Sequence, residues 1–101
     1  MKRDNFLFTI GYQGDTAIVD ATSKKKYAKL KTLELALKGL FKPAVCSAIL
    51  NNSREELESI KKIYNEKNEE KIESVEALKR VFGVNEVPEG IEKVLFIWDD
   101  C

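Results

Sequence analysis

The chain has 101 residues and no net charge, because 17 lysines and arginines balance 17 aspartates and glutamates. Its 44% hydrophobic content is that of an ordinary globular protein, so we expect one domain over residues 1–101 with a core that needs no disulfide or metal. No apolar run approaches the roughly 20 residues of a membrane-spanning helix, and no long apolar segment near the start indicates a signal peptide. We therefore expect a cytoplasmic protein that does not enter a membrane.

Cysteine and histidine usage narrows the chemistry. The chain has no histidine, which removes the commonest general base and the commonest zinc ligand. Its only cysteines, Cys46 and Cys101, lie far apart, so we expect reduced thiols rather than a disulfide framework. No spacing of residues matches a catalytic, metal, cofactor or nucleotide motif. We expect neither an enzyme nor a protein with a bound metal or cofactor.

Two strands in a hairpin are predicted at the start of the chain. The run Phe6–Ile10 is apolar and rich in aromatic and β-branched residues, which favours a buried strand extending over 6–12. A second strand is predicted over Thr16–Ala21. The connection between them contains Gly14, which can adopt the positive φ that tight hairpin turns require. Gly11 is expected to mark a bulge or a close approach of the backbone.

Residues 22–31 are expected to form a loop or an irregular first turn, and four helices are predicted after them. The predicted helices span Thr32–Lys38, Pro43–Leu50, Arg54–Lys67 and Val75–Phe82. Ser53 should open the third of these as a capping box with Glu56. Ser74 should cap the fourth, and Gly83 should end it.

The last predicted element is a strand over Ile91–Trp98. Its apolar part, Val94–Trp98, has the same character as Phe6–Ile10, so we expect the two runs to lie side by side in one sheet. The predicted fold is α+β, with a small three-stranded sheet of the N-terminal hairpin and the C-terminal strand in the order 2-1-3, covered by three to four short helices. The direction of the last strand is left open.

Charge is spread unevenly along the chain. Residues 1–45 contain nine lysines and arginines against four aspartates and glutamates, whereas residues 46–101 contain eight against thirteen. This asymmetry indicates either a face that meets a partner of opposite charge, or two halves that neutralise each other within one fold. The acidic pair Asp99 and Asp100 has no spaced partner of the kind a metal motif requires, so we interpret it as solvated charge after the last strand.

A basic segment supplies the candidate contact residues. They are Lys24, Lys25, Lys26, Tyr27, Lys29, Lys31 and Lys42. The lysines could hold phosphates by charge while the Tyr27 ring stacks on a base, which is how many proteins bind single-stranded nucleic acids. A loop that merely stays hydrated would have the same composition. We predict a contact surface here, for a polyanion or for a partner.

Part of this region resembles a helix-turn-helix, the DNA-binding motif. The segment is Thr32–Leu50, and the spacing of a small residue, a turn glycine and two apolar positions is approximated by Leu35, Gly39, Val45 and Ala48. The segment departs from the motif at Leu35, which is large where the two helices must cross closely. Pro43 falls inside the helix that would read the bases. A buried pair of helices is the alternative interpretation.

These observations favour a small non-catalytic domain that binds a protein partner or a second copy of itself, and no small-molecule substrate is indicated. An exposed edge on the second strand would accept a strand from the partner, with Asp20 guarding that edge. Two alternatives stay open. Residues 22–51 could bind nucleic acid, or Cys46 could be the nucleophile of a thiol enzyme if a nearby helix N-terminus lowered its pKa. The apolar neighbours of Cys46 favour a structural thiol instead.

Overall fold

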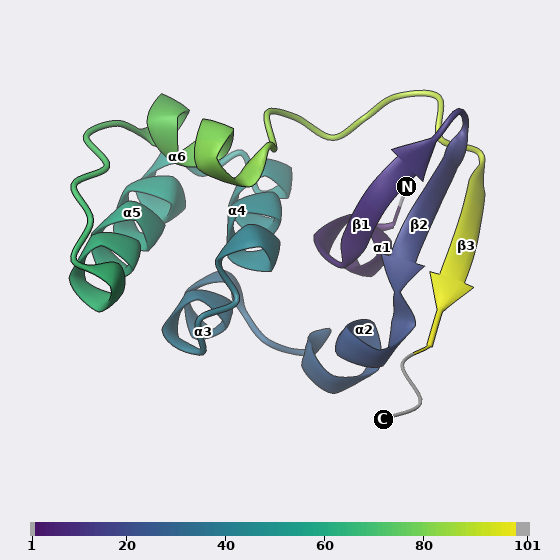
Figure 1. Cartoon of the computed structure of the whole chain (residues 1–101), viewed down its shortest axis with the longest axis horizontal. Helices are drawn as coiled ribbons and strands as arrows, with labels where there is room; N and C mark the ends of the chain where they lie inside the picture. The colour runs from purple at the N-terminus through teal and green to yellow at the C-terminus, as the bar shows by residue number, and fades with distance from the viewer. Residues whose placement is uncertain (1, 99–101) are drawn as a thin grey trace. The chain divides into compact units, whose positions relative to one another are not determined.

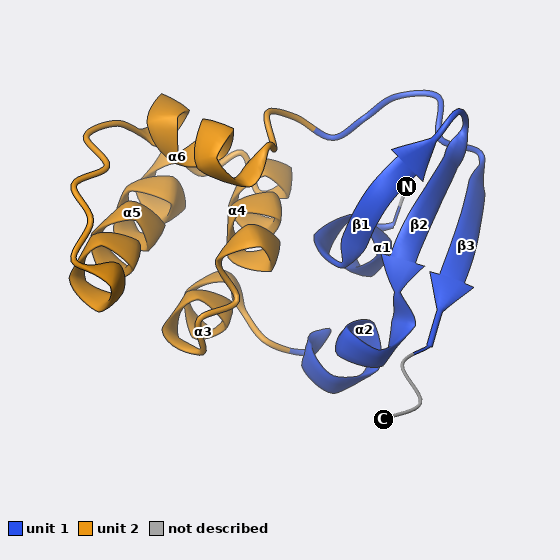
Figure 2. Ribbon diagram, viewed as in Figure 1, with its two compact units in different colours: residues 1–29, 87–101 blue, residues 30–86 orange. Residues whose placement is uncertain are grey.

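The computed structural model describes residues 2–98, and the chain divides into two compact units (Figure 2). The sheet unit contains residues 1–29 and 87–101, and the helical unit contains residues 30–86. The elements are α1 (Arg3–Leu7), β1 (Thr9–Gln13), β2 (Thr16–Asp20), α2 (Ala21–Tyr27), α3 (Thr32–Leu37), α4 (Phe41–Leu50), α5 (Arg54–Asn68), α6 (Val75–Phe82) and β3 (Lys93–Ile97) (Figure 1). A compact unit is not the same as a domain that folds independently, so the single domain expected for residues 1–101 stays a prediction.

The three-stranded sheet confirms the expected α+β class but corrects the expected strand order. β2 lies in the centre, antiparallel to β1 and parallel to β3. The order is therefore β1-β2-β3 rather than 2-1-3, and β3 pairs with β2 instead of with the first strand. The prediction assumed that the most apolar strand is central. Backbone pairing, however, decides the position of a strand. A central strand has buried side chains, and β2 has two that are fully buried, Ala17 and Val19.

The first apolar run is divided between a helix and a strand instead of forming one strand over 6–12. Phe6 and Leu7 end α1, Phe8 follows it, and all three side chains are buried. β1 begins only at Thr9, and most of its residues are not buried. So short an apolar run can be buried in a helical turn as well as in a strand, because its periodicity does not separate the two.

The hairpin between β1 and β2 confirms two predictions. Gln13 pairs with Thr16, so the turn consists of two residues, and Gly14 adopts the expected positive φ of 60°. The pairing register shifts between Thr9 and Gly11, which is the irregularity predicted at Gly11. β1 is therefore an interrupted strand at one edge of the sheet.

Residues 22–31, expected to be a loop or an irregular turn, contain most of α2, which follows β2 without a connecting segment. The Asp20 carboxylate caps this helix by accepting hydrogen bonds from the backbone N–H and the hydroxyl group of Ser23, at 3.1 and 2.8 Å. The expected role of Asp20 as guard of a free β2 edge is wrong, because β2 has a neighbouring strand on each side. Three lysines in the last turn suit the negative end of the helix dipole.

Two hydrogen bonds tie α1 to α2. Arg3 donates one to the carbonyl oxygen of Ala28, directly after α2, at 3.0 Å. Lys24 of α2 donates the other to the side-chain oxygen of Asn5 in α1, at 2.8 Å. Both helices also contact β2, so α2 has a fixed position beside the sheet.

The four predicted helices form the helical unit by packing against one another. α4 is central, because it contacts α3, α5 and α6 and most of its residues are buried. The rings of Phe41, Tyr64 and Phe82, one from each of α4, α5 and α6, meet at centroid distances of 5.0, 5.5 and 6.3 Å. Between α3 and α4 the hydroxyl groups of Thr32 and Ser47 share a buried hydrogen bond of 2.6 Å, so both polar groups are satisfied.

The ends of the later helices confirm the local signals in the sequence. Ser53 caps α5 and Ser74 caps α6, each by accepting a hydrogen bond of 3.1 Å from the backbone N–H three residues further on. Gly83 ends α6 in the left-handed conformation, with a φ of 67°. The Glu56 side chain accepts a hydrogen bond from Asn51, so it does not complete the predicted capping box. α4 begins two residues before its predicted start.

Replacing Leu78 by alanine should destabilise the protein, because this side chain of α6 is fully buried and its truncation leaves a cavity. We expect the free energy of unfolding, measured by chemical denaturation, to fall by about 2–5 kcal/mol. Val81 lies on the same helix with 53% of its surface exposed. The control Val81→Ala should therefore change the stability by about 0.5 kcal/mol or less. Equal losses in the two variants would contradict the assignment of the buried face of α6.

Candidate functional site

β3 is an edge strand, and its last three residues and the residue after it expose four consecutive large apolar side chains. Leu95, Phe96, Ile97 and Trp98 are 53%, 43%, 45% and 59% exposed, and we call residues 95–98 the apolar edge. Natural proteins usually protect an edge strand with charged residues, proline or a bulge. The only charged residue of β3 is Lys93, at its start. The apolar edge therefore lacks the charged residues that usually protect an exposed edge strand.

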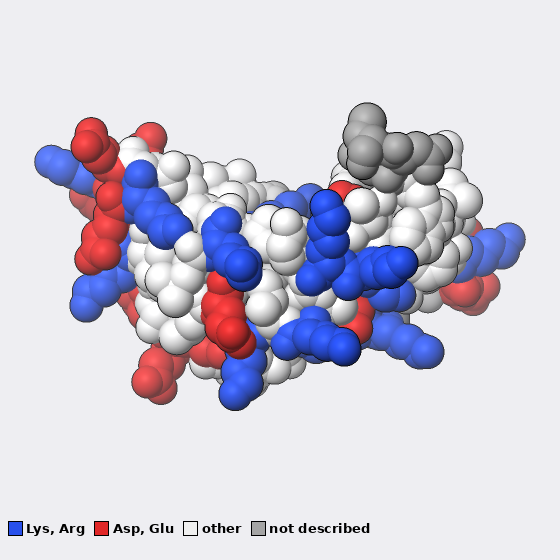
Figure 3. Space-filling model, turned by 90° about the horizontal axis from the view of Figure 1, so that it is seen from below, with Lys and Arg blue, Asp and Glu red and all other residues white. Residues whose placement is uncertain are grey.

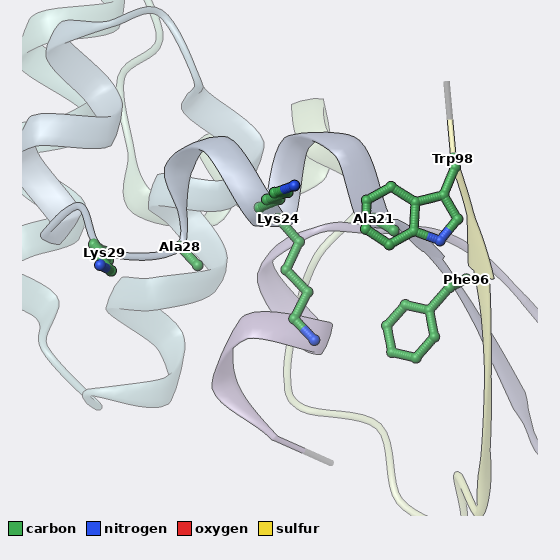
Figure 4. Close-up of a pocket in the computed structure, with 7 residues that line it drawn as sticks. Ala21, Lys24, Ala28, Lys29, Phe96 and Trp98 are labelled. Carbon is green, nitrogen blue, oxygen red and sulfur yellow. The ribbon is translucent and has the colours of Figure 1, made fainter. Parts of the chain in front are cut away.

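The apolar edge has two faces, because side chains alternate along a strand. Phe96 pairs with Val19, which is fully buried, so Phe96 belongs to the inner face of the sheet. Trp98, two residues further on, projects in the same general direction, toward α2 (Figure 4). By the same alternation, Leu95 and Ile97 belong to the opposite, outer face.

The other edge of the sheet, β1, is less suited to accept a strand. The register shift between Thr9 and Gly11 interrupts its row of backbone groups. Its two exposed apolar side chains, Ile10 and Tyr12, are separated by glycine, and the strand ends on the polar Gln13. Of the two edges, only β3 combines an unbroken register with a continuous apolar surface.

A pocket with a cavity volume of about 340 Å³ lies between α2 and β3 (Figure 4). It is lined by Ala21, Lys24, Lys25, Ala28, Lys29, Phe96 and Trp98. The first four of these recur at the three- and four-residue spacing that places side chains on one side of a helix. α2 and the residues directly after it thus form one wall, and the rings of Phe96 in β3 and of Trp98 directly after β3 form the other. Among the described residues, no carboxylate lines the pocket.

The three lysines of the pocket differ in their partners. The Lys24 Nζ atom donates its hydrogen bond to Asn5 and lies 4.7 Å from the centroid of the Phe96 ring, which is a cation–π arrangement. Lys25 and Lys29 are exposed and make no hydrogen bond or ion pair within residues 2–98. Lys24 therefore steadies the aromatic wall, whereas the other two ammonium groups are available to a ligand.

The pocket unites three of the seven contact residues predicted from the sequence, namely its three lysines. Of the other four, Lys26 and Tyr27 lie on α2 but do not line the pocket, and Lys31 and Lys42 belong to the helical unit. The aromatic residues that line the pocket are Phe96 and Trp98 instead of the predicted Tyr27. Both belong to a run that was predicted to be a buried strand, and no local signal marks them as exposed.

The charge asymmetry between the two halves of the sequence does not carry over to the two structural units. The sheet unit has seven lysines and arginines against seven aspartates and glutamates, and the helical unit has ten against ten. The cause is that the acidic C-terminal residues belong to the same unit as the basic N-terminal ones. In the view of Figure 3, lysine and arginine side chains gather over α2.

The segment that resembles a helix-turn-helix forms α3 and α4. A recognition helix must present exposed side chains to the base edges of the major groove. Six of the ten residues of α4 are buried, and this helix lies at the centre of the helical unit. The arrangement therefore fits the alternative interpretation, a buried pair of helices.

Cys46 is a core residue of α4, with 2% of its surface exposed. Burial raises the pKa of its thiol to about 12, and the nearby Lys42 opposes this shift only in part. A catalytic cysteine needs the opposite, a lowered pKa and access to the substrate. These properties weigh against the hypothesis of a thiol enzyme that uses Cys46.

Three further observations concern metal binding, membrane-spanning helices and similarity to known proteins. Among residues 2–98, no group of three or more histidine, cysteine, aspartate or glutamate side chains is placed to hold a metal ion, and Asp99 and Asp100 lie outside the described residues. Within the same part of the chain, no helix has the length and apolar character to cross a membrane. No protein-family model, curated protein or solved structure matches the chain.

The raised pKa of Cys46 predicts a loss of stability at high pH. In the unfolded chain the thiol ionises near its ordinary value of 9.0, whereas in the folded chain it stays protonated up to about pH 12. Unfolding thus releases a proton between these values, so stability falls as pH rises. We expect the free energy of unfolding to fall by roughly 1 kcal/mol per pH unit more steeply in the wild type than in Cys46→Ala. Chemical denaturation on either side of pH 9 measures this, and parallel pH profiles would contradict it.

Proposed function

We propose that the protein is a non-catalytic binding domain that recognises a protein partner by strand addition at β3. In this mode an extended segment of the partner pairs with the free edge of β3 and enlarges the three-stranded sheet. The observation that carries the proposal is the apolar edge, which is exposed at the side of the sheet where residues 2–98 supply no further strand. Strand addition was expected on the second strand, but that strand is central, so β3 takes its place.

Two kinds of contact would hold the added strand. The free backbone N–H and C=O groups along β3 would form a ladder of hydrogen bonds, each contributing about 0.5–1.5 kcal/mol. The exposed outer-face side chains of Leu95 and Ile97 would be covered, at roughly 25 cal/mol for each Å² of apolar surface removed from water. Backbone pairing gives the register, and the side chains of Leu95 and Ile97 on the outer face select apolar residues in the partner.

The charges beside the apolar edge favour a partner segment with acidic residues. If two β3 strands paired in antiparallel fashion, the two-fold axis would place both α2 helices on the same face of the joint sheet. The pocket lysines lie beside Phe96 and Trp98, near the end of β3, so antiparallel pairing would place the two sets at opposite ends of the joint sheet and they would not repel each other. A partner segment with acidic residues near this end of β3 would be attracted by these lysines.

The substitution Leu95→Lys tests the proposal, because it puts a charge in the middle of the edge without touching a buried side chain. A protein retained by the wild-type chain from an extract of the source cells is purified, and its affinity is measured by titration calorimetry. We expect the variant to bind it about tenfold more weakly or worse. Val81→Lys is the matched control, because Val81 is apolar and, like Leu95, 53% exposed but lies on α6. This control should bind like the wild type.

Hydrogen exchange then locates the binding surface. The bound partner should slow the exchange of backbone amides in residues 93–98 and leave those of α6 unchanged. Sedimentation of the chain alone should show a monomer. A partner that protects another surface, or that binds Leu95→Lys as tightly as the wild type, would contradict strand addition at β3. A dimer that Leu95→Lys dissociates would show that the added strand comes from a second copy.

A further inference from the structure

We propose that the pocket between α2 and β3 binds a nucleotide, with its base stacked on the Trp98 ring and its phosphate held by Lys25 and Lys29. No motif in the sequence indicates such a ligand. The proposal does not depend on strand addition, which uses the backbone edge of β3 and the outer-face residues Leu95 and Ile97. The nucleotide site uses the side of β3 that faces α2, so each proposal can fail without the other.

The aromatic wall of the pocket is suited to a base. Trp98 directly follows β3, and its ring and that of Phe96 project into the pocket (Figure 4). Trp98 is the more exposed of the two, at 59% against 43%, and the Lys24 ammonium group lies over one face of the Phe96 ring, so Trp98 is the better ring for stacking. The small side chains of Ala21 and Ala28 on the opposite wall leave room for a flat ring. Stacking on an aromatic side chain is favourable for any base, because every base has a π face.

The lysines select the charged part of the ligand. Lys25 and Lys29 have no partner within residues 2–98, and no carboxylate among these residues lines the pocket. A phosphate monoester carries a charge of about −1.5 to −2 at neutral pH, so it neutralises neighbouring ammonium groups better than a single carboxylate does. Lysine binds phosphate as a point charge, and the pocket has no arginine for the two-pronged recognition of a carboxylate.

The size of the pocket sets the class of nucleotide. Its volume of about 340 Å³ lies at the lower end of the range typical of small-molecule sites, which suits one nucleotide rather than a dinucleotide. The lining residues are alanine, lysine, phenylalanine and tryptophan, none of which accepts a hydrogen bond from a base edge through its side chain. We therefore expect little preference among the bases.

Trp98 is the only tryptophan of the chain, so its fluorescence reports directly on the pocket. Adenosine 5′-monophosphate should quench this fluorescence in a saturable titration, with excitation at the long-wavelength edge where adenine does not absorb. Adenosine contains the base without the phosphate, and inorganic phosphate contains the charged group without the base, so each represents one half of the ligand. Since stacking and charge act together only in the nucleotide, each half should bind about tenfold more weakly than the whole.

The double substitution of Lys25 and Lys29 by alanine tests the charged wall. At physiological ionic strength, where charges act over only about 8 Å, it should weaken the affinity for adenosine 5′-monophosphate about three- to tenfold and leave adenosine unaffected. Lys26→Ala is the matched control, because Lys26 is exposed on the same helix but does not line the pocket. Circular dichroism checks that these exposed substitutions leave the fold intact.

Three results would overturn the nucleotide site: no saturable quenching by adenosine 5′-monophosphate, equal binding of inorganic phosphate alone, or an equal loss of affinity in Lys26→Ala. A free nucleotide and a single-stranded nucleic acid both offer a base and a phosphate. A short oligodeoxyadenylate distinguishes these two possible ligands. If the natural ligand is a single strand, the oligonucleotide should bind more tightly than the mononucleotide, with an affinity that falls steeply as salt rises and still depends on Lys25 and Lys29. If it is a free nucleotide, the mononucleotide should bind at least as tightly.

Discussion

The parallel pairing of β2 with β3 is the constraint on which the sheet unit and both proposed sites depend. It joins residues 16–20 to residues 93–97 in an unbroken register. The carbonyl oxygen of Asp15 fixes the start of this register by accepting hydrogen bonds from the backbone N–H groups of Glu92 and Lys93. Without β3 the sheet would be reduced to a two-stranded hairpin, and two strands contribute little stability by themselves. The same pairing puts β3 at the edge and beside α2.

Placing the most apolar strand at an edge creates a conflict between stability and exposure. Leu95 and Ile97 would contribute more to the free energy of folding in a central strand, where neighbours on both sides cover more of each side chain. An unprotected edge of this kind also risks unspecific pairing with other chains. Local rules of this sort are most often broken at functional sites, and for that reason we propose that β3 carries the binding surface.

α2 turns the opposite side of the same strand into a pocket. Asp20 ends β2 and caps α2, so the helix leaves the sheet without a flexible connection. Lys24 then links three elements, because it bonds Asn5 of α1 from α2 and lies over the Phe96 ring of β3. A short strand thus carries two surfaces of different chemistry: an apolar outer face with a free backbone edge, and an aromatic face rimmed by lysines.

The sequence by itself determined the elements whose causes are local. Ser53 and Ser74 cap helices and Gly83 ends one, because each acts on backbone groups only a few residues away. It did not determine α1, because so short an apolar run is ambiguous between helix and strand. Only the tertiary structure decided the strand order, the direction of β3, the exposure of Trp98 and its meeting with the lysines of α2. Each of these depends on backbone pairing between segments at the two ends of the chain, which no local pattern of residues encodes.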